Sequence, residues 1–409
     1  MVTPPFGEQR VFVHVGAPKT GTTYLQTVLY HHRDLLRELG VLYPAVHYDD
    51  HFFAAVDLQN LDFSGEHRPE AAGRWEQIAA QVREWPGTSV ISHDVLAGAT
   101  SQQVQQAIRS LAPATVHIVC TARDLVQQLP SHWQEDVKHG QRATFDEWYD
   151  AIMRRDVSEW QFRWFWRVED IPDVLRRWGS TLPPEHVHVV TVPRPGAPAG
   201  LLWQRFAGVI GIRADDVDLG VVRDPNRGLG TAEVELIRRV NAAHAYALRP
   251  TAYERDIKGV LAHEVLGVIT RTPRLRLPGR LLGEVSELAR SWSTTLAQAG
   301  YDLVGDVDEL TPGENPSVTD STVVDPNDVS AVAATAVFML LDRLAECRRT
   351  EQDSAEQLRA ELASAHAVID EHRGLPPVER IKRTVVEIGG SSRPVGAALQ
   401  VYRRLRGRT

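Results

Sequence analysis

The sequence predicts an α/β fold, in which a parallel sheet is flanked by helices and followed by a C-terminal helical extension. Short apolar runs rich in β-branched residues alternate with amphipathic segments, a pattern typical of strands buried in a parallel sheet. The first apolar run ends at a glycine-containing turn that leads into an amphipathic segment. A heptad pattern near the C-terminus predicts the helical extension.

The elements follow from these patterns in chain order. Four apolar runs predict strands at 11–15, 88–92, 116–121 and 186–192. Apolar residues at helical spacing predict helices at 22–39, 51–60, 74–84, 101–110, 145–178, 201–210 and 281–299. We therefore expect an α/β domain at 8–312, a linker rich in Pro, Ser, Thr, Asp and Asn at 313–328, an amphipathic helix at 329–373, and a basic flexible tail at 374–409.

The turn after the first strand predicts an anion-binding unit related to a P-loop. Gly16 and Gly21 keep the glycine spacing of the G-x-x-x-x-G-K-[ST] pattern. Thr22 stands where that pattern has its lysine, and Lys19 lies inside the turn instead. Backbone N–H groups and the positive end of the following helix dipole would bind one anion. The alternative is an ordinary strand–turn–helix with a chance lysine.

A second motif follows the third predicted strand. Arg123 lies just past the strand end, and Ser131 lies eight residues later on a predicted helix. A dianionic phosphate is well matched by a permanently charged, planar guanidinium together with a hydroxyl donor. The alternative is that Arg123 pairs with Asp124 or another carboxylate and that Ser131 is simply an exposed helical residue.

The two motifs together resemble those of the sulfotransferases, whose donor is 3′-phosphoadenosine 5′-phosphosulfate (PAPS). The family's P-K-[ST]-G-[ST]-[ST] core, its 5′-phosphosulfate loop, stands here as Pro18, Lys19, Thr20, Gly21, Thr22 and Thr23. The H-x-G-x-P-K-T-G-T-T start is similar to the broad bacterial group, and the resemblance extends over about 8–312. It implies a P-loop-like fold and transfer without a metal.

The resemblance also implies roles for single residues. Lys19 would stabilise the bridging oxygen of the leaving group, and the amides around the second glycine would hold the 5′-phosphate. Arg123 and Ser131 would bind the 3′-phosphate. Arg227 and Gly228 resemble a reduced form of the basic R-K-G-type loop that closes over this phosphate, although the lysine is missing.

The acceptor must lose a proton, and a polar pair follows the second strand. His93 and Asp94 lie beyond its carboxyl end, where ligands bind in open parallel sheets. His93 is the better base by default because its usual pKa lies near neutrality, whereas Asp94 would need a raised pKa. The alternative for His93 is a strand-end cap bonded to the backbone.

The function predicted is transfer of a sulfuryl group from PAPS to a hydroxyl or amine of a carbohydrate, glycolipid or small-metabolite acceptor. The alternatives are a P-loop kinase that uses a nucleoside triphosphate, for which no acidic Walker B strand is evident, and a non-catalytic nucleotide-binding module. Two further sets of residues have open interpretations. A metal site or the polar part of an acceptor pocket is possible for His47, Asp49, Asp50 and His51. Core packing or the lining of an acceptor pocket is possible for Trp148, Trp160, Trp164, Trp166 and Trp178.

Composition limits the partners. A net charge of −8 gives no reason to expect nucleic acid, and the two cysteines form no disulfide or zinc pattern. The longest late apolar run, 331–341, is about half of the ~20 residues that a membrane span needs, so a cytoplasmic protein is expected. The heptad at 341–369 predicts either a self-associating coiled coil or a helix packed on its own domain. The basic tail is expected to be solvated or to contact an anionic surface.

Overall fold

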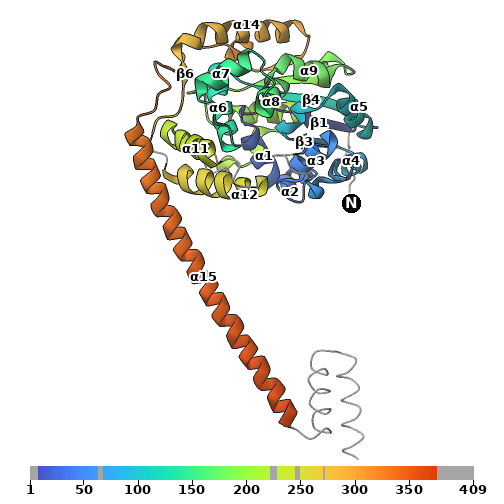
Figure 1. Ribbon diagram of the computed structural model, residues 1–409. Helices are drawn as coiled ribbons and strands as arrows, with labels where there is room; N and C mark the ends of the chain where they lie inside the picture. The colour runs from blue at the N-terminus through green and yellow to red at the C-terminus, as the bar shows by residue number, and fades with distance from the viewer. Residues whose placement is uncertain (1–7, 63–67, 222–227, 245–248, 270–271, 375–409) are drawn as a thin grey trace, which may run out of the picture. The chain divides into compact units, whose positions relative to one another are not determined.

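A six-stranded parallel sheet forms the centre of the structure, a computed structural model that describes residues 8–62, 68–221, 228–244, 249–269 and 272–374 (Figure 1). The strand order is β2-β3-β1-β4-β5-β7. The strands are β1 (Arg10–His14), β2 (Val41–Leu42), β3 (Thr88–Ser92), β4 (Thr115–Ala122), β5 (Val187–Thr191) and β7 (Asp302–Val304). Helices flank this sheet, so the predicted α/β class with a parallel sheet is confirmed.

The register of the central strands brings the motifs to one edge of the sheet. β1 lies between β3 and β4, and His14 pairs with Ser92 on one side and Val119 on the other. The carboxyl ends of these parallel strands therefore point the same way. The turn after β1, the residues after β3 and Arg123 after β4 consequently lie at the same edge.

Helices of the first half follow the predicted pattern, except that the segments predicted as single helices at 22–39 and 145–178 are interrupted, the second of them forming three helices. They are α1 (Thr22–His31), α2 (Arg33–Glu38), α3 (Asp50–Gln59), α4 (Arg74–Glu84), α5 (Ser101–Ser110), α6 (Leu125–Lys138), α7 (Phe145–Met153), α8 (Trp160–Glu169) and α9 (Ile171–Gly179). The predicted single helix at 22–39 is two helices, because His32 leaves the helical conformation with φ −101° and ψ 13°.

The later helices are α10 (Leu201–Ile210), α11 (Thr231–His244), α12 (Pro250–Tyr253), α13 (Gly267–Ile269), α14 (Leu282–Gln298) and α15 (Pro326–Gly374). Between α12 and α13 the chain forms a π-helix over Glu254–Leu266, a rare conformation that occurs mostly as a single turn. This π-helix contacts α6 and α11, and it has no counterpart among the predicted elements. A small two-stranded sheet pairs β6 (Leu277–Pro278) with β8 (Val318–Thr319), which lies in the predicted linker.

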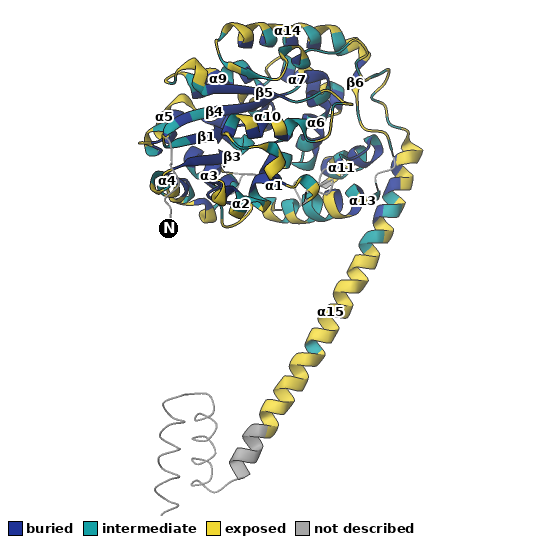
Figure 2. Ribbon diagram, turned by 180° about the vertical axis from the view of Figure 1, so that it is seen from behind, coloured by how far each residue is buried: buried dark blue, intermediate teal, exposed yellow. Residues whose placement is uncertain are grey.

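The core lies between the sheet and the helices on its two faces. On one face, Phe12 and Val90 of the sheet pack in one cluster with Leu25 of α1 and with Trp203 and Phe206 of α10. These side chains are almost wholly buried. Helix α9 lies across the sheet from α1 in both views (Figures 1 and 2). Burial of this apolar area fixes β1 and α1, and so fixes the turn between them.

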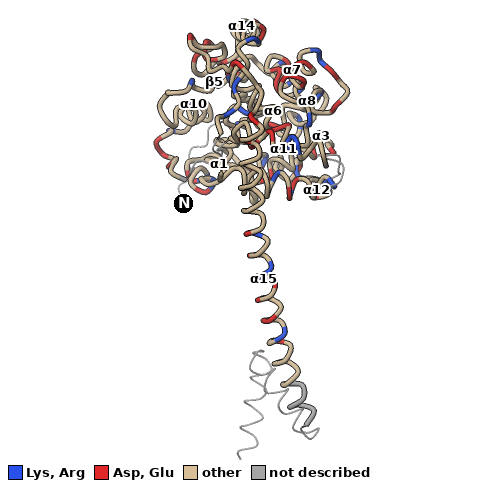
Figure 3. The backbone as a smooth tube through the Cα atoms, turned by 60° about the vertical axis from the view of Figure 1, so that its left-hand side comes forward, with Lys and Arg blue, Asp and Glu red and all other residues tan. Residues whose placement is uncertain are grey.

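Helix α15 crosses the boundary between two compact units, 1–336 and 337–409. Its first turns bury Val329, Val332 and Ala336 within the first unit. Beyond them the described part is mostly exposed (Figure 2), and charges of both signs alternate along it (Figure 3). The heptad leucines that the structure describes are exposed: Leu341, Leu344, Leu358 and Leu362.

Self-association through this helix stays a prediction of the sequence. The basic tail beyond Gly374 lies outside the described residues. Within the described ranges, no helix combines the length and the apolar character needed to cross a membrane.

Candidate functional site

The turn after β1 is fastened to β4 through its backbone. The Ala17 N–H donates to the carbonyl of Thr121 at 2.9 Å, and the Thr121 N–H donates to the carbonyl of Gly16 at 2.6 Å. The hydroxyl of Thr20 donates to the Ala17 carbonyl and lies against the Thr121 hydroxyl. Thr20 is fully buried, so its side chain holds the turn in place rather than facing a ligand.

Helix α6 fastens the next part of the turn. Gln128 donates to the Pro18 carbonyl at 3.0 Å and also to the buried carboxylate of Glu169. The Arg123 guanidinium donates to the Lys19 carbonyl at 3.2 Å. Because the carbonyls of the turn are used in this way, they point away from the start of α1. Pro18 therefore contributes its backbone, not its ring, to the site.

The start of α1 is left open to an anion. Its N-cap is Gly21, with φ +90° and no side-chain cap. A Cβ at Gly21 would lie 2.6 Å from Leu202 Cδ2, so this position needs glycine on two grounds. Lys19 also has a positive φ, +60°, a conformation that is uncommon outside glycine and that clusters at functional sites. The N-terminal N–H groups of the helix therefore remain available for an external acceptor.

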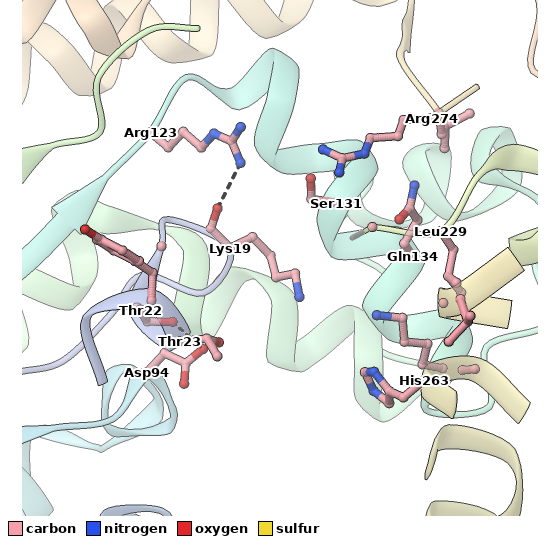
Figure 4. Close-up of a pocket in the computed structure, with 18 residues that line it drawn as sticks. Lys19, Thr22, Thr23, Asp94, Arg123, Ser131, Gln134, Leu229, His263 and Arg274 are labelled. Carbon is pink, nitrogen blue, oxygen red and sulfur yellow. Dashed lines mark hydrogen bonds between the residues drawn. The ribbon is translucent and has the colours of Figure 1, made fainter. Parts of the chain in front are cut away.

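A cavity of about 450 Å³ opens at this helix start (Figure 4). It is lined by Lys19, Gly21, Thr22, Thr23, Tyr24, Asp94, Arg123, Ser131, Gln134, Lys138, Gly228, Leu229, Ala262, His263, Gly267, Val268, Arg274 and Leu275. Eight of these are among the residues that the sequence singles out. The structure thus gathers the turn, the end of β3, the end of β4 and α6 around one space of ligand size.

One wall of the cavity carries two guanidinium groups. Arg123 and Arg274 both face it, with the Ser131 hydroxyl between them in Figure 4. Burial and the nearby Arg274 lower the pKa of Arg123, although Asp124 opposes this. Neither arginine forms an ion pair with a carboxylate within the described chain; Arg123 donates instead to the carbonyl of Lys19 and to the Gln127 amide oxygen. Two unneutralised guanidiniums beside a hydroxyl suit a dianion.

Gly228 lies against this wall, where a Cβ would be 3.6 Å from Arg274 Nε. Its predicted neighbour Arg227 lies outside the described residues. Ser131 donates to the Gln127 carbonyl one turn earlier at 2.8 Å, which leaves its oxygen on the cavity wall. Arg274 was not found from the sequence, because it lies about 150 residues after Arg123 in a segment without a recognisable motif.

The ammonium of Lys19 is held by Glu135 of α6. Its Nζ lies 2.9 Å from Glu135 Oε2. Burial disfavours the charge on Lys19, but the Glu135 carboxylate outweighs this and raises the pKa of Lys19. Burial alone would raise the pKa of Glu135, yet the ammonium groups of Lys19, Lys138 and Lys258 hold it well below its usual value. Lys19 therefore stays protonated beside the turn.

The two residues after β3 have different surroundings. Asp94 lines the cavity, and the Thr22 hydroxyl donates to its Oδ2 at 3.4 Å. His93 is not among the lining residues, and its Nδ1 accepts the Val95 N–H at 3.2 Å as the N-cap of a short 3₁₀ turn. Burial lowers the pKa of His93, although Asp94 and Asp49 oppose this. The imidazole thus acts as a neutral strand-end cap, the structural alternative that the sequence allowed.

Other polar residues noted in the sequence have structural roles. Buried His51 accepts the Ser92 N–H at Nδ1 and contacts the Pro44 carbonyl through Nε2. Asp50 accepts the N–H groups of residues 46 and 47. No group of three or more His, Cys, Asp or Glu side chains in the described ranges is placed to hold a metal ion. Trp148 and Trp178 are core residues.

Comparisons with known proteins find similarity among solved structures. No model of a known family and no curated protein matches the chain. Among solved structures, the chain is similar to a sulfotransferase from Alicyclobacillus acidocaldarius, with 18% identity, a TM-score of 0.38, and coverage of 61% of this chain and 100% of that one. It is also similar to the sulfotransferase domain from the curacin biosynthetic pathway, with 12% identity, a TM-score of 0.31, and coverage of 73% and 99%. Similarities at this level do not establish a shared activity.

Replacing Glu135 should destabilise the protein in a pH-dependent way. We expect Glu135→Gln to lower the free energy of unfolding by about 1–3 kcal/mol near pH 7, because partly buried ammonium groups lose their carboxylate. A carboxylate with a depressed folded-state pKa stabilises above its unfolded pKa of about 4.3, and this contribution is lost as the pH falls through the folded value. The difference between the two proteins should therefore shrink at about pH 3.

Urea denaturation at the two pH values measures this difference. The matched control is Glu76→Gln, which removes an exposed carboxylate 2.6 Å from Arg83 and should cost less than about 1 kcal/mol. Equal losses in the two variants, or a loss for Glu135→Gln that does not depend on pH, would contradict the role given to Glu135.

Proposed function

We propose that this protein is a sulfotransferase that moves a sulfuryl group from PAPS to a hydroxyl or amine of a carbohydrate, glycolipid or small-metabolite acceptor. The observation that carries the proposal is the P-K-T-G-T-T turn, with Lys19 inside it, facing the same cavity as Arg123 and Ser131. These two motifs are about a hundred residues apart in the chain. Their convergence on one cavity is what a donor with an anion at each end requires.

The residues present fit such a donor. The open N-terminus of α1, capped only by Gly21, offers backbone N–H groups to a 5′-phosphate. Arg123 and Arg274, which form no ion pair with a carboxylate of the described chain, would both donate to a 3′-phosphate. The Ser131 hydroxyl would turn toward this phosphate from the Gln127 carbonyl, to which it donates. Gly228 lines the same wall, and a Cβ there would meet Arg274 at an ordinary contact distance of 3.6 Å. The role that the resemblance implies for Arg227 stays a prediction, because this residue lies outside the described residues.

Different side chains of the protein would then carry out different parts of the transfer reaction. PAPS, when bound, supplies a sulfuryl group already joined to a good leaving group. Transfer of this kind depends mainly on positioning and on stabilising charge at the departing oxygen. The protonated ammonium of Lys19, which belongs to the turn, would stabilise the negative charge on the departing oxygen. Thr22 and Thr23 place their hydroxyls on the same wall.

Asp94 is the group that we propose takes the acceptor's proton. It lies on the cavity wall, in the charge field of Lys19, and its carboxylate is oriented by the Thr22 hydroxyl. A general base must lie within reach of the proton that it removes, so geometry ranks before pKa. His93 meets this condition less well because its Nδ1 is used by the backbone of Val95.

One observation favours a second candidate, a P-loop kinase. Asp94 follows β3, the strand next to β1, and lies 3.4 Å from the Thr22 hydroxyl. A threonine–aspartate pair of this kind holds magnesium in nucleoside-triphosphate enzymes. Against it, the lysine that should follow Gly21 is absent. The acid after β4, Asp124, caps α6 by accepting the Val126 N–H at 2.9 Å.

Titration calorimetry separates these candidates. Adenosine 3′,5′-bisphosphate should bind much more tightly than ATP with magnesium, because the cavity offers separate cations to a 3′-phosphate. Arg123→Ala and Arg274→Ala should each weaken the bisphosphate about 10–100-fold, the loss of charged hydrogen bonds. Arg255→Ala is the control, since this arginine is exposed and its ion pair within the described residues is with Asp256. Preference for ATP with magnesium would overturn the assignment.

Lys19→Ala should abolish transfer while leaving the fold intact. We expect the rate to fall about 10²–10³-fold, the usual cost of removing one stabilising donor. Glu135 keeps Lys138 and Lys258 as partners, so the thermal midpoint should change little. Transfer from radiolabelled PAPS to a panel of neutral and anionic phenols and glycosides measures the rate, with Thr27→Ala of α1, a half-buried residue, as control. Unimpaired turnover would exclude a catalytic role for Lys19.

The residues after β3 can be told apart by a matched pair of variants. Asp94→Asn keeps the shape but cannot accept a proton, so kcat should fall about 10²–10⁴-fold. His93→Asn removes the imidazole yet keeps an oxygen able to cap the Val95 N–H, so kcat should change less than about tenfold. The reverse order of effects would make His93 the base, and two unaffected variants would favour a non-catalytic binding module.

A further inference from the structure

Lysine is scarce in this chain, and its placement is uneven. The sequence has four lysines against 41 arginines. Three of the four, Lys19, Lys138 and Lys258, point their ammonium groups at the single carboxylate of Glu135, with N–O distances of 2.9, 3.3 and 3.3 Å. They come from the turn after β1, the last residue of α6 and the π-helix. We call these four side chains the lysine cluster.

The choice of lysine here has a physical meaning. Arginine carries a planar, delocalised charge, whereas lysine carries a compact ammonium with three donors that can rotate toward an oxyanion. A chain that uses arginine almost everywhere else has compact cations at this one place. Such a cluster suits the binding of a small oxyanion. A purely structural ion pair would not require lysine, because arginine would serve as well.

The cluster carries more positive than negative charge. Glu135 is the one carboxylate within ion-pair distance of the three ammonium groups in the described chain. Asp94 and Glu169 also attract Lys19 from farther away, so the surplus lies on Lys138 and Lys258. Unpaired charge that is partly buried is unfavourable, and the side chain of Lys138 is only 13% exposed.

The neighbouring histidines do not supply the missing negative charge. His139 donates from Nδ1 to the Glu135 carbonyl at 2.9 Å and accepts the Lys258 ammonium at Nε2. Burial and the charge of Lys258 lower the pKa of His139 to about 4. Burial and the charge of Lys138 likewise lower the pKa of His263. The two imidazole rings are neutral and bring no negative charge. The excess positive charge of the cluster can therefore be balanced by an external anion.

Of the cluster's lysines, Lys138 lines the cavity on a wall to which the proposed function assigns no donor group. Lys138 and His263 line the cavity, and Figure 4 shows His263 on the opposite side from Arg123, with Lys19 between. Lys258 lies behind this wall and is held by His139 at 2.7 Å. In the proposed function, the donor's 5′-phosphosulfate already has partners in the start of α1 and in Lys19, and its 3′-phosphate has partners in the two arginines. Lys138 then has no assigned partner on the donor.

We propose that the acceptor itself is anionic, and that the lysine cluster binds a carboxylate, phosphate or sulfate group of the acceptor through Lys138, with the charge of Lys258 behind it. This inference rests on the proposed function and names the class of its acceptor. The acceptor then carries two features: an oxyanion at Lys138 and a hydroxyl or amine that reaches Asp94. Neutral sugars and simple alcohols lack the first feature and are poor acceptors.

Calorimetry on protein saturated with adenosine 3′,5′-bisphosphate tests the acceptor class. The probes are matched pairs that differ only in charge, such as 4-nitrophenyl β-D-glucuronide against the corresponding glucoside, together with inorganic sulfate and phosphate. We expect the charged probes to bind at least about tenfold more tightly than the neutral ones. Lys138→Met should remove this preference and leave the affinity for the bisphosphate unchanged.

Two further variants complete the experiment. Arg255→Met removes an exposed cation of the same π-helix and should keep the preference, and Lys138→Arg, which keeps the charge, should restore part of it. Three results would overturn the proposal: no binding of any anionic probe at millimolar concentration, equal binding of charged and neutral probes, or loss of bisphosphate affinity in Lys138→Met, which would assign the cluster to the donor. Failure of the bisphosphate to bind the unmodified protein would instead reject the proposed function.

Discussion

The hydrogen bonds that fasten the turn after β1 to its neighbours determine the rest of the site. Thr121 of β4 exchanges backbone bonds with Gly16 and Ala17, while Arg123 and Gln128 take the carbonyls farther along. A carbonyl used in this way cannot point into the cavity. The N–H groups at the start of α1 face it instead, and the helix dipole adds to their positive potential. The backbone alone therefore creates a positive potential suited to an anion, without any charged side chain.

The charged side chains extend this site without neutralising it. Arg123 donates to a backbone carbonyl, so one residue both fixes the turn and brings a guanidinium to the cavity wall. Glu135 keeps Lys19 protonated, yet one carboxylate shared by three lysines leaves the region basic. This arrangement exists within a chain whose net charge is −8. In the proposed function, it is this local excess of positive charge, rather than the net charge of the chain, that favours an anionic ligand.

Much of the fold was predictable because its signals are local. The strand at 88–92 and the helices at 74–84, 101–110 and 201–210 have the predicted bounds, since each is set by apolar periodicity within a few residues. The turn motif is local too, so its glycines and lysine could be read directly. The break between α1 and α2 was missed, because the apolar face continues through His32 while the backbone does not.

The other site residues could not be predicted, because sequence spacing does not show which distant residues lie close together in the fold. Arg274 lines the same cavity wall as Arg123 because the chain returns to this wall about 150 residues later. For His93, the sequence allows both a base and a cap, and the fold adds that Nδ1 of the imidazole accepts the Val95 N–H. Lys138 differs, because a residue type used four times in 409 positions carries information by its rarity. That signal is global, so a search for short motifs passes over it, and only the fold shows that three of the four lysines meet at one carboxylate.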